Sequence, residues 1–152
     1  MDVDPKLELD RQVRRSIYDG LLTAAVCPTA AEIATLLSVP LSEVRAALGR
    51  LADAHILVLQ PDTGEVLMAN PFSTVPTPFL VRAGVRSYFG NCIWDALGIP
   101  AMLRKDAVID ASCGDCGTAM TLRITNGELE PAEGLAHFAV PAVHWWANIV
   151  FT

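Results

Sequence analysis

Residues 90–103 read GNCIWDALGIPAML, and this stretch combines the start of a helix with two reactive side chains. Asn91 is a favourable N-cap residue, so we expect a short helix with Cys92 in its first turn. Cys92 and Asp95 are three residues apart and would share one helical face. The helix dipole and the free backbone N–H groups stabilise a thiolate, which predicts a lowered pKa for Cys92. A thiolate beside a carboxyl group can bind a soft metal and move a proton.

The rest of this stretch predicts how the helix packs and where it ends. Ile93, Leu97 and Ala101 are expected to form a second face that packs against the protein. Pro100 is expected to interrupt or kink the helix after about two turns. A purely structural role stays open, in which Cys92 is buried and the nearby carboxylate solvates the helix start.

The N-terminal part of the chain predicts three helices and a hairpin. Residues 11–25 carry apolar residues at helical spacing, and Thr-Ala-Ala-Glu at 29–32 is a capping box that opens a second helix. A third helix with one apolar face follows. The apolar positions are Val13, Ile17, Leu21 and Leu22 in the first helix and Val44, Ala47, Leu48 and Leu51 in the third. Residues 55–60 and 65–69 then predict a hairpin, which completes the element order of a winged helix.

A winged helix invites a DNA-binding interpretation, which the charges oppose. Residues 1–73 hold ten acidic and six basic residues, whereas a domain that reads a DNA groove normally has a basic surface. The hairpin tip carries Asp62 and Glu65 and neither lysine nor arginine. The whole chain has a net charge of −6, which gives no general attraction for nucleic acid or anionic membranes, and no apolar run is long enough to span a bilayer. We expect this unit to serve packing or dimerisation.

A proline-rich stretch, residues 70–80, predicts a linker or crossing strand between two units. We therefore expect a winged-helix-like domain over residues 1–73 and a sheet domain over residues 74–152. The strands expected in the second domain are residues 79–86, 106–111, 119–125, 128–130, 135–140 and 147–152, with a tight turn at Asn126-Gly127 and a turn or short helix from Pro141. The predicted fold class is α+β: a winged-helix-like three-helix unit with a hairpin, then a mixed or antiparallel sheet with a short cysteine-bearing helix.

The chain has four cysteines, at Cys27, Cys92, Cys113 and Cys116. No secretory signal is visible at the N-terminus, so we expect a cytoplasmic protein whose thiols are free or bind metal rather than form disulfides. Cys113 and Cys116 form a CxxC motif, which is half of a structural zinc site. The other candidate ligands follow no zinc-binding spacing; they are Cys27, His55, His137 and His144. A turn with two free thiols is therefore favoured over zinc.

Residues 91–103 resemble the catalytic segment of the alkylmercury (organomercurial) lyases. In that family a tryptophan or asparagine precedes the cysteine, an aspartate follows three residues later, and an apolar-Pro-Ala segment comes next. The family's order of strands is similar to that of Ser112-Cys113, Thr121-Leu122 and Val140-Pro141. The N-terminal helical unit also resembles the family's winged-helix-like first domain. The resemblance covers most of residues 30–152, and its specific part is the cysteine-bearing stretch.

The resemblance implies cleavage of a carbon–mercury bond by protonolysis. Cys92 matches the family's first catalytic cysteine and Asp95 matches its aspartate, so both would contact mercury and Asp95 would relay the proton. Mercury(II) is soft and prefers thiolate ligands. The resemblance implies no organic cofactor, a small organomercurial substrate, and a mercury-accepting reductase or small thiols as partners. Cys113 matches a family cysteine that lies outside the catalytic pair.

The sequence departs from the family in one respect. The family's second catalytic cysteine follows a segment like residues 148–152, and this sequence supplies no such cysteine. We expect that Cys113 or Cys116 is a substitute thiol, or that activity is weak, or that the natural product extends past Thr152 through a shortened sequence or a UGA codon decoded as selenocysteine. The alternative function is a non-catalytic thiol-based metal-binding protein or a winged-helix regulator in which the thiols act as a sensor.

Overall fold

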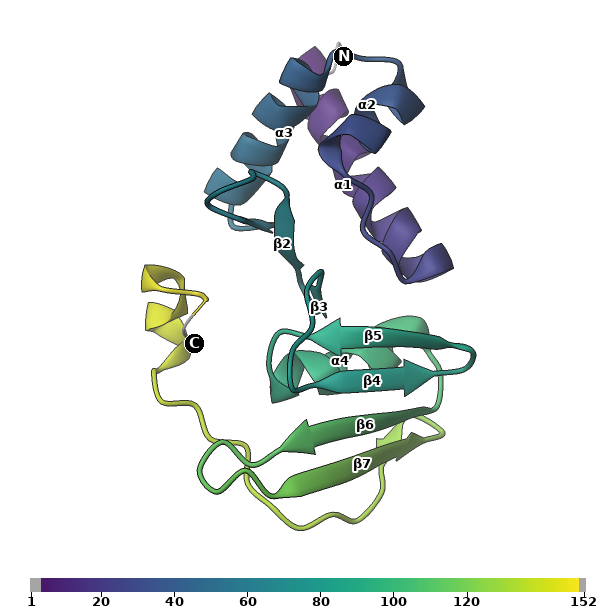
Figure 1. Cartoon of the computed structure of the whole chain (residues 1–152), viewed down its shortest axis with the longest axis vertical. Coiled ribbons are helices and arrows are strands. Elements are labelled where there is room, and N and C mark those ends of the chain that lie inside the picture. Colours follow the sequence, from purple (N-terminus) through teal and green to yellow (C-terminus); the bar gives the residue numbers. More distant parts are fainter. Residues whose placement is uncertain (1–3, 151–152) are drawn as a thin grey trace.

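The computed structural model describes residues 4–150. Its N-terminal part is a bundle of three helices, α1 (Pro5–Ala24), α2 (Ala30–Leu37) and α3 (Leu41–Asp53) (Figure 1). The predicted apolar positions are buried in the bundle, except that Leu22 lies at the surface. α1 begins earlier than the predicted residue 11 because the side chain of Asp4 caps it, accepting a hydrogen bond from the backbone N–H of Lys6 at 2.9 Å.

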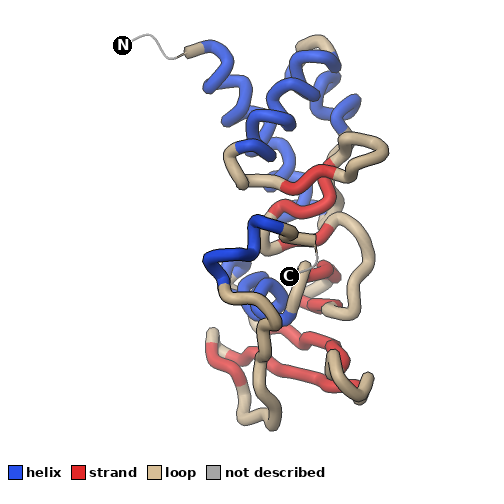
Figure 2. Tube along the Cα trace, turned by 90° about the vertical axis from the view of Figure 1, so that its left-hand side faces the viewer, coloured by secondary structure: helices blue, strands red, loops and turns tan. Residues whose placement is uncertain are grey.

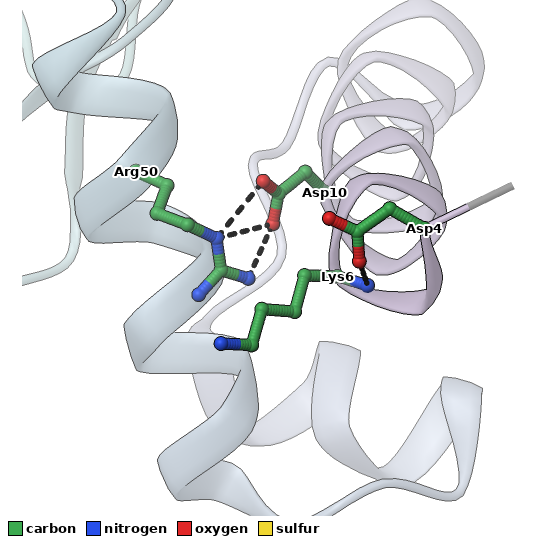
Figure 3. A network of polar contacts seen from close by, with 4 residues as sticks. All are labelled: Asp4, Lys6, Asp10 and Arg50. Atoms are coloured by element: carbon green, nitrogen blue, oxygen red, sulfur yellow. Dashed lines mark hydrogen bonds and ion pairs between the residues drawn. The ribbon is translucent and has the colours of Figure 1, made fainter.

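Two sets of polar contacts fix the bundle. The predicted capping box is confirmed, because the Thr29 hydroxyl accepts from the backbone N–H of Glu32 at 3.2 Å and the Glu32 carboxylate accepts from the Thr29 N–H at 2.7 Å. Asp10 on α1 accepts from the Nε of Arg50 on α3 at 3.0 Å, and a second guanidinium nitrogen contacts the same carboxylate (Figure 3). This forked ion pair holds α1 against α3.

One antiparallel sheet extends from the bundle to the opposite end of the molecule (Figures 1 and 2). Its strands are β1 (Val58–Leu59), β2 (Val66–Ala69), β3 (Phe72–Ser73), β4 (Leu80–Ala83), β5 (Arg86–Gly90), β6 (Ala107–Ser112), β7 (Ala119–Thr125) and β8 (Glu128–Leu129). Their order across the sheet is β1-β2-β3-β5-β4-β6-β7-β8. The predicted combination of helices with an antiparallel sheet is confirmed, whereas the winged-helix identity of the first unit stays a prediction.

Strand β3 links the two parts of the sheet. It pairs with β2 on one side and with β5 on the other, so the sheet continues across the predicted boundary through Phe72 and Ser73. The division into residues 1–73 and 74–152 stays a prediction. The single strand predicted over residues 79–86 is wrong, because the chain turns at Gly84, whose φ of +60° suits glycine, and forms the β4–β5 hairpin.

Helix α4 (Ile93–Leu103) packs on one face of the sheet and carries the cysteine-bearing stretch. Its buried residues are Ala96, Ile99 and Pro100. The predicted packing face is correct in part: Ile93 and Leu97 are half-buried and pack against the core, whereas Ala101 is exposed. The helix does not end at Pro100, as was one expectation, but continues to Leu103. The proline removes only one backbone hydrogen bond, and burial of its ring adds apolar contact that offsets this loss.

Close packing between α4 and the sheet depends on one glycine. A Cβ atom on Gly90, the last residue of β5, would lie 2.6 Å from the backbone nitrogen of Ala96. Such a separation is well inside van der Waals contact, so only glycine allows this approach. The chain can therefore turn directly from β5 into α4, which sets the position of the segment between them.

The C-terminal segment contains no strand among the described residues after β8, which corrects two predictions. Residues 135–140 form an irregular, mostly exposed segment, and residues 142–147 form a 3₁₀ helix, η1 (Ala142–Ala147), followed by a turn up to Val150. Residues 151–152 of the predicted last strand lie outside the described residues. The apolar side chains here serve aromatic contacts rather than a sheet: Trp146 stacks on His55, with ring centroids 4.1 Å apart.

Within residues 4–150, no helix combines the length and the apolar content that crossing a bilayer requires.

Candidate active site

Cys92 lies at the junction of β5 and α4. It is the N-cap of α4, with extended φ and ψ of −145° and −177°, so the predicted cap, Asn91, is wrong by one residue. The Cys92 sulfur makes no ordinary capping hydrogen bond. The backbone N–H groups of Asp95 and Trp94 nevertheless lie near enough to favour the thiolate. The sulfur is thus held at the positive end of a helix.

Burial outweighs this stabilisation of the thiolate. Burial raises the pKa of the Cys92 thiol, the Asp95 N–H lowers it, and the negative charge of the Asp95 carboxylate raises it. The net direction is upward, so the lowered pKa that the sequence predicts for Cys92 is wrong. The physical reason is that burial deprives the thiolate of solvation by water, and the N–H groups of one helix terminus stabilise the thiolate by less than this loss.

Asp95 is brought together with Cys92, as the helical spacing predicts. The two side chains influence each other: the Asp95 side chain raises the pKa of the Cys92 thiol, and the Cys92 side chain lowers that of the Asp95 carboxyl. Burial raises the pKa of the Asp95 carboxyl, and the side chains of Asn91 and Cys92 lower it by less. The site therefore contains a thiol and a neighbouring carboxyl, each of which retains its proton to higher pH than it would in water.

Three residues that the sequence did not predict for the site form a chain of hydrogen bonds that leads to the Asp95 carboxyl. Asn91 donates its Nδ2 to Oδ2 of Asp95 at 2.9 Å and to Oδ1 of Asn70 at 3.1 Å. The hydroxyl of Tyr18 on α1 donates to the backbone carbonyl of Asn70 at 2.9 Å. These hydrogen bonds join α1, the β2–β3 turn and α4 around the carboxyl group. The four-residue spacing of Asn91 and Asp95 could have predicted their contact. Nothing in the local sequence around Tyr18 or Asn70 could have predicted that these two residues join the site.

Burial and charge at Tyr18 show how close α1 comes to the site. Burial raises the pKa of the Tyr18 hydroxyl, the cationic Arg14 lowers it, and the negative charge of Asp95 raises it. The Arg14 guanidinium carbon lies 5.8 Å from the centre of the Tyr18 ring. The N-terminal bundle thus places a phenol, with a cation over its ring, within electrostatic reach of the Asp95 carboxyl.

An apolar cavity borders the exposed side of α4. It has a volume of about 510 Å³ and is lined chiefly by aromatic and aliphatic side chains of α4 and the C-terminal segment: Trp94, Phe138, Val140, Pro141 and Trp145. Trp94 sits between Cys92 and Asp95 in the sequence and is 64% exposed. The cavity therefore gives the cysteine-bearing helix an apolar neighbour large enough for a small organic group.

The remaining predicted thiols lie elsewhere. Cys113 and Cys116 occupy the turn between β6 and β7, and Cys27 lines a different cavity of about 510 Å³ between the bundle and the sheet, where burial raises the pKa of the Cys27 thiol to about 11. His137 and His144 are exposed. Within residues 4–150, no group of three or more cysteine, histidine or carboxylate side chains is arranged to hold a metal ion.

Cys116 differs from the other thiols in its electrostatic surroundings. Hydrogen bonding by the side chain and backbone of Thr118, followed by the side chain of Cys113, lowers the pKa of the Cys116 thiol. The Cys116 sulfur lies 3.1 Å from the Thr118 hydroxyl oxygen and is exposed. The most easily ionised thiol described here is thus in the hairpin turn and not at α4.

Comparison with known proteins places this arrangement in a family. No curated protein matches the chain. The crystal structure of the mercury-bound form of MerB2 has a similar fold, with a TM-score of 0.63 and 20% sequence identity over 82% of this chain and 59% of that one. This chain therefore spans less than two thirds of the length of that protein. The family model for alkylmercury lyase (MerB) matches residues 72–152, which include both Cys92 and Asp95, and the chain belongs to the alkylmercury lyase family.

Proposed function

We propose that this protein is an organomercurial lyase that cleaves carbon–mercury bonds by protonolysis, with Cys92 as the thiolate ligand of mercury and Asp95 as the proton donor. The observation that carries the proposal is the placement of the Cys92 thiol and the Asp95 carboxyl together at the start of α4, where each side chain shifts the pKa of the other. Membership of the alkylmercury lyase family supports it. The substrate class is a small organomercurial cation, and the reaction requires no organic cofactor.

The neighbouring thiol and carboxyl give the reaction its proton. As the Cys92 sulfur binds mercury, its proton moves to the ionised Asp95 carboxylate, whose raised pKa makes it a better proton acceptor. Sulfur then donates electron density through mercury to the carbon. The Asp95 O–H bond breaks, the carbon–hydrogen bond forms and the carbon–mercury bond breaks. The organic group leaves as a hydrocarbon and mercury(II) stays on the Cys92 thiolate and the Asp95 carboxylate, with no net oxidation or reduction.

The surroundings of the pair favour this sequence of steps. The raised pKa of Asp95 keeps its carboxyl group protonated to higher pH, so that the acid survives until the carbon is ready to accept the proton. Asn91 fixes the orientation of the carboxyl group through the 2.9 Å hydrogen bond to Oδ2. The apolar cavity at Trp94 is where the organic group of the substrate would lie.

The N-terminal unit has a supporting role in this proposal. Tyr18 on α1 reaches the site through Asn70, which supports packing rather than DNA binding as the task of the winged-helix-like unit. Mercury(II) left on Cys92 would pass to a small thiol or a mercury-accepting reductase in the cytoplasm, because thiolates compete well for a soft ion.

Hydrocarbon release tests the function directly. The protein is incubated with phenylmercury and an excess of a small monothiol, and benzene is measured by headspace gas chromatography. We expect benzene from the unsubstituted protein, loss of both mercury binding at α4 and benzene release in Cys92→Ser, and retained binding with release about a hundredfold slower in Asp95→Asn. Asp110→Asn, which removes an exposed carboxylate paired with Arg82, is the matched control and should cleave normally.

The same experiment separates the lyase from the alternative. Binding of phenylmercury without benzene release would contradict the lyase and favour a non-catalytic thiol sensor. Equal loss of binding and cleavage in Asp95→Asn would show that Asp95 is a main ligand for substrate mercury or a structural group rather than the proton donor.

A further inference from the structure

The turn between β6 and β7 holds two cysteines in a fixed arrangement that the proposed lyase reaction does not use. The backbone N–H of Cys113 donates to the carbonyl of Thr118 at 2.9 Å, and the N–H of Gly117 donates to the carbonyl of Cys113 at 2.9 Å. Gly117 has a φ of +70°, which favours glycine. These bonds close the turn on the end of the hairpin, so Cys113 and Cys116 are held three residues apart on a supported loop.

The two thiols of this turn lie in the same six-residue loop, and one of them is open to solvent. The Cys113 side chain is near enough to affect the pKa of the Cys116 thiol, and the Cys116 sulfur is 3.1 Å from the Thr118 hydroxyl oxygen. Cys116 is exposed and Cys113 is half-buried. A Cβ atom on Gly114 or Gly117 would meet no other atom within 4 Å, so the turn is uncrowded and an ion or an exchanging thiol can approach through the exposed Cys116.

The turn offers two thiol ligands, and this number favours mercury(II) over zinc. Structural zinc takes four ligands in a tetrahedron, and within residues 4–150 no third cysteine, histidine or carboxylate joins these two thiols in a metal-binding group. Mercury(II) is soft and is satisfied by two thiolates in a nearly linear arrangement. We propose that Cys113 and Cys116 form a dithiol site that binds one mercuric ion.

The binding step balances without an oxidant or a reductant. Two S–H bonds break, two sulfur–mercury bonds form, and two protons pass to solvent, while mercury stays divalent. The site needs inorganic mercury(II) only, so it goes beyond the proposed lyase function and does not depend on it.

The register of the sheet places this dithiol at the same edge as Cys92. Phe89 of β5 pairs with Leu80 of β4, which pairs with Asp110 of β6. Cys92 follows Phe89 by three residues and Cys113 follows Asp110 by three, and the β5 and β6 arrows point to the same side in Figure 1. The registered residues Phe89 and Asp110 are two strand spacings apart, about 10 Å. Mercury(II) released from Cys92 would therefore leave at the edge of the sheet that also carries the second, chelating thiol site.

Retention of mercury against a competing monothiol tests the site. The full chain carrying Cys27→Ser and Cys92→Ser keeps only the turn thiols; it is loaded with mercuric chloride, titrated with 2-mercaptoethanol, and analysed by native mass spectrometry. We expect one mercury per monomer. Half of the mercury is removed at a certain concentration of 2-mercaptoethanol, and adding Cys116→Ser should lower this concentration about tenfold or more. The reason is that the variant lacks the second thiolate, whose high effective concentration in the same turn makes a chelate hold the ion. Asp115→Asn, between the two cysteines, is the matched control and should retain mercury.

Three outcomes would overturn the site. These are equal retention with and without Cys116→Ser, one mercury shared between two chains, or zinc retained as firmly as mercury from an equimolar mixture. The background lacks Cys92, so the result is independent of phenylmercury cleavage. Circular dichroism of each variant, expected to match the parent because the turn is exposed, checks that the fold is intact.

Discussion

Asn91 places one amide nitrogen between two acceptors, Oδ2 of Asp95 at 2.9 Å and Oδ1 of Asn70 at 3.1 Å. Both hydrogens of the amide group are thereby used, which assigns the nitrogen and oxygen of the side chain. The amide oxygen, Oδ1 of Asn91, is buried and accepts no hydrogen bond from any described residue. An amide held in this way is a donor for the Asp95 carboxyl and leaves a free acceptor beside the Cys92–Asp95 pair.

Asn91→Ala should slow carbon–mercury cleavage while leaving mercury binding intact. The substitution removes the donor that orients the Asp95 carboxyl, so we expect kcat to fall about tenfold, the effect of roughly one charge-assisted hydrogen bond, with little change in KM. Steady-state hydrocarbon release gives both constants. Gln12→Ala, which removes a 3.2 Å amide–carboxylate contact with Glu8 on the exposed side of α1, is the matched control. A rise in KM with unchanged kcat would show that Asn91 acts in binding instead.

Asp95→Asn should stabilise the fold at neutral pH, although the same substitution should slow carbon–mercury cleavage. Burial raises the pKa of Asp95 above its ordinary value of 3.8, so the folded protein binds this proton more tightly than the unfolded chain does. Stability from the protonated carboxyl is full below about pH 4 and is lost as pH rises through the folded-state pKa. Thermal unfolding should therefore show a Tm increase for Asp95→Asn at pH 7 that shrinks towards pH 4.

Asp110→Asn should show the reverse dependence and serves as the control for that measurement. The hydrogen bond from Arg82 lowers the pKa of the Asp110 carboxyl, so its stabilisation is present above its ordinary pKa and is lost as pH falls through the folded-state value. The substitution should lower Tm at pH 7 and have no effect at low pH. A Tm change for Asp95→Asn that is negative at pH 7, or equal at all pH values, would contradict the effect of burial on Asp95.

Cys116 should be alkylated faster than Cys92 at pH 7, and Cys27 slowest. The thiolate is the reacting form. The pKa of Cys116 is lowered by Thr118 and Cys113, that of Cys92 is raised by burial, and that of Cys27 is raised to about 11. Timed pulses of iodoacetamide followed by peptide mass spectrometry give the rate at each site. Labelling of Cys92 before Cys116 would show that the helix N-terminus outweighs burial.

These differences mark what the sequence could and could not predict. The helices of the bundle were predicted because caps and apolar periodicity are local signals, as at Thr29 and Glu32. The start of α4 was misplaced because the Asn91 side chain, a good cap in isolation, is taken up by Asp95 and Asn70. The pKa of Cys92 was mispredicted because the position of a helix end is visible in a sequence and its burial is not.

The contacts made across long stretches of chain escaped prediction for a related reason. Tyr18 lies fifty-two residues from Asn70, and no periodicity connects them. The C-terminal segment holds short apolar runs of the kind found in strands, yet a strand also needs a neighbouring edge, and Trp146 stacks on His55 instead. The placement of Cys92 beside Asp95, in contrast, needed only three-residue spacing on one helix and was predicted.

Gly90→Ala should destabilise the protein and disturb the site together. The added Cβ would lie 2.6 Å from the backbone nitrogen and 2.9 Å from the Cα of Ala96, so α4 must move away from β5. We expect a loss of about 2 kcal/mol in the free energy of unfolding, as for other overpacked sites, together with slower cleavage, because Cys92 lies between the two elements. Urea unfolding and hydrocarbon release measure the two effects. Gly49→Ala on α3 is the matched control: its Cβ would meet no atom within 4 Å, and alanine in a helix should stabilise by about 0.5–1 kcal/mol. Equal stability of the two variants would show that α4 can shift without cost, and that the close approach at Gly90 does not determine the position of Cys92.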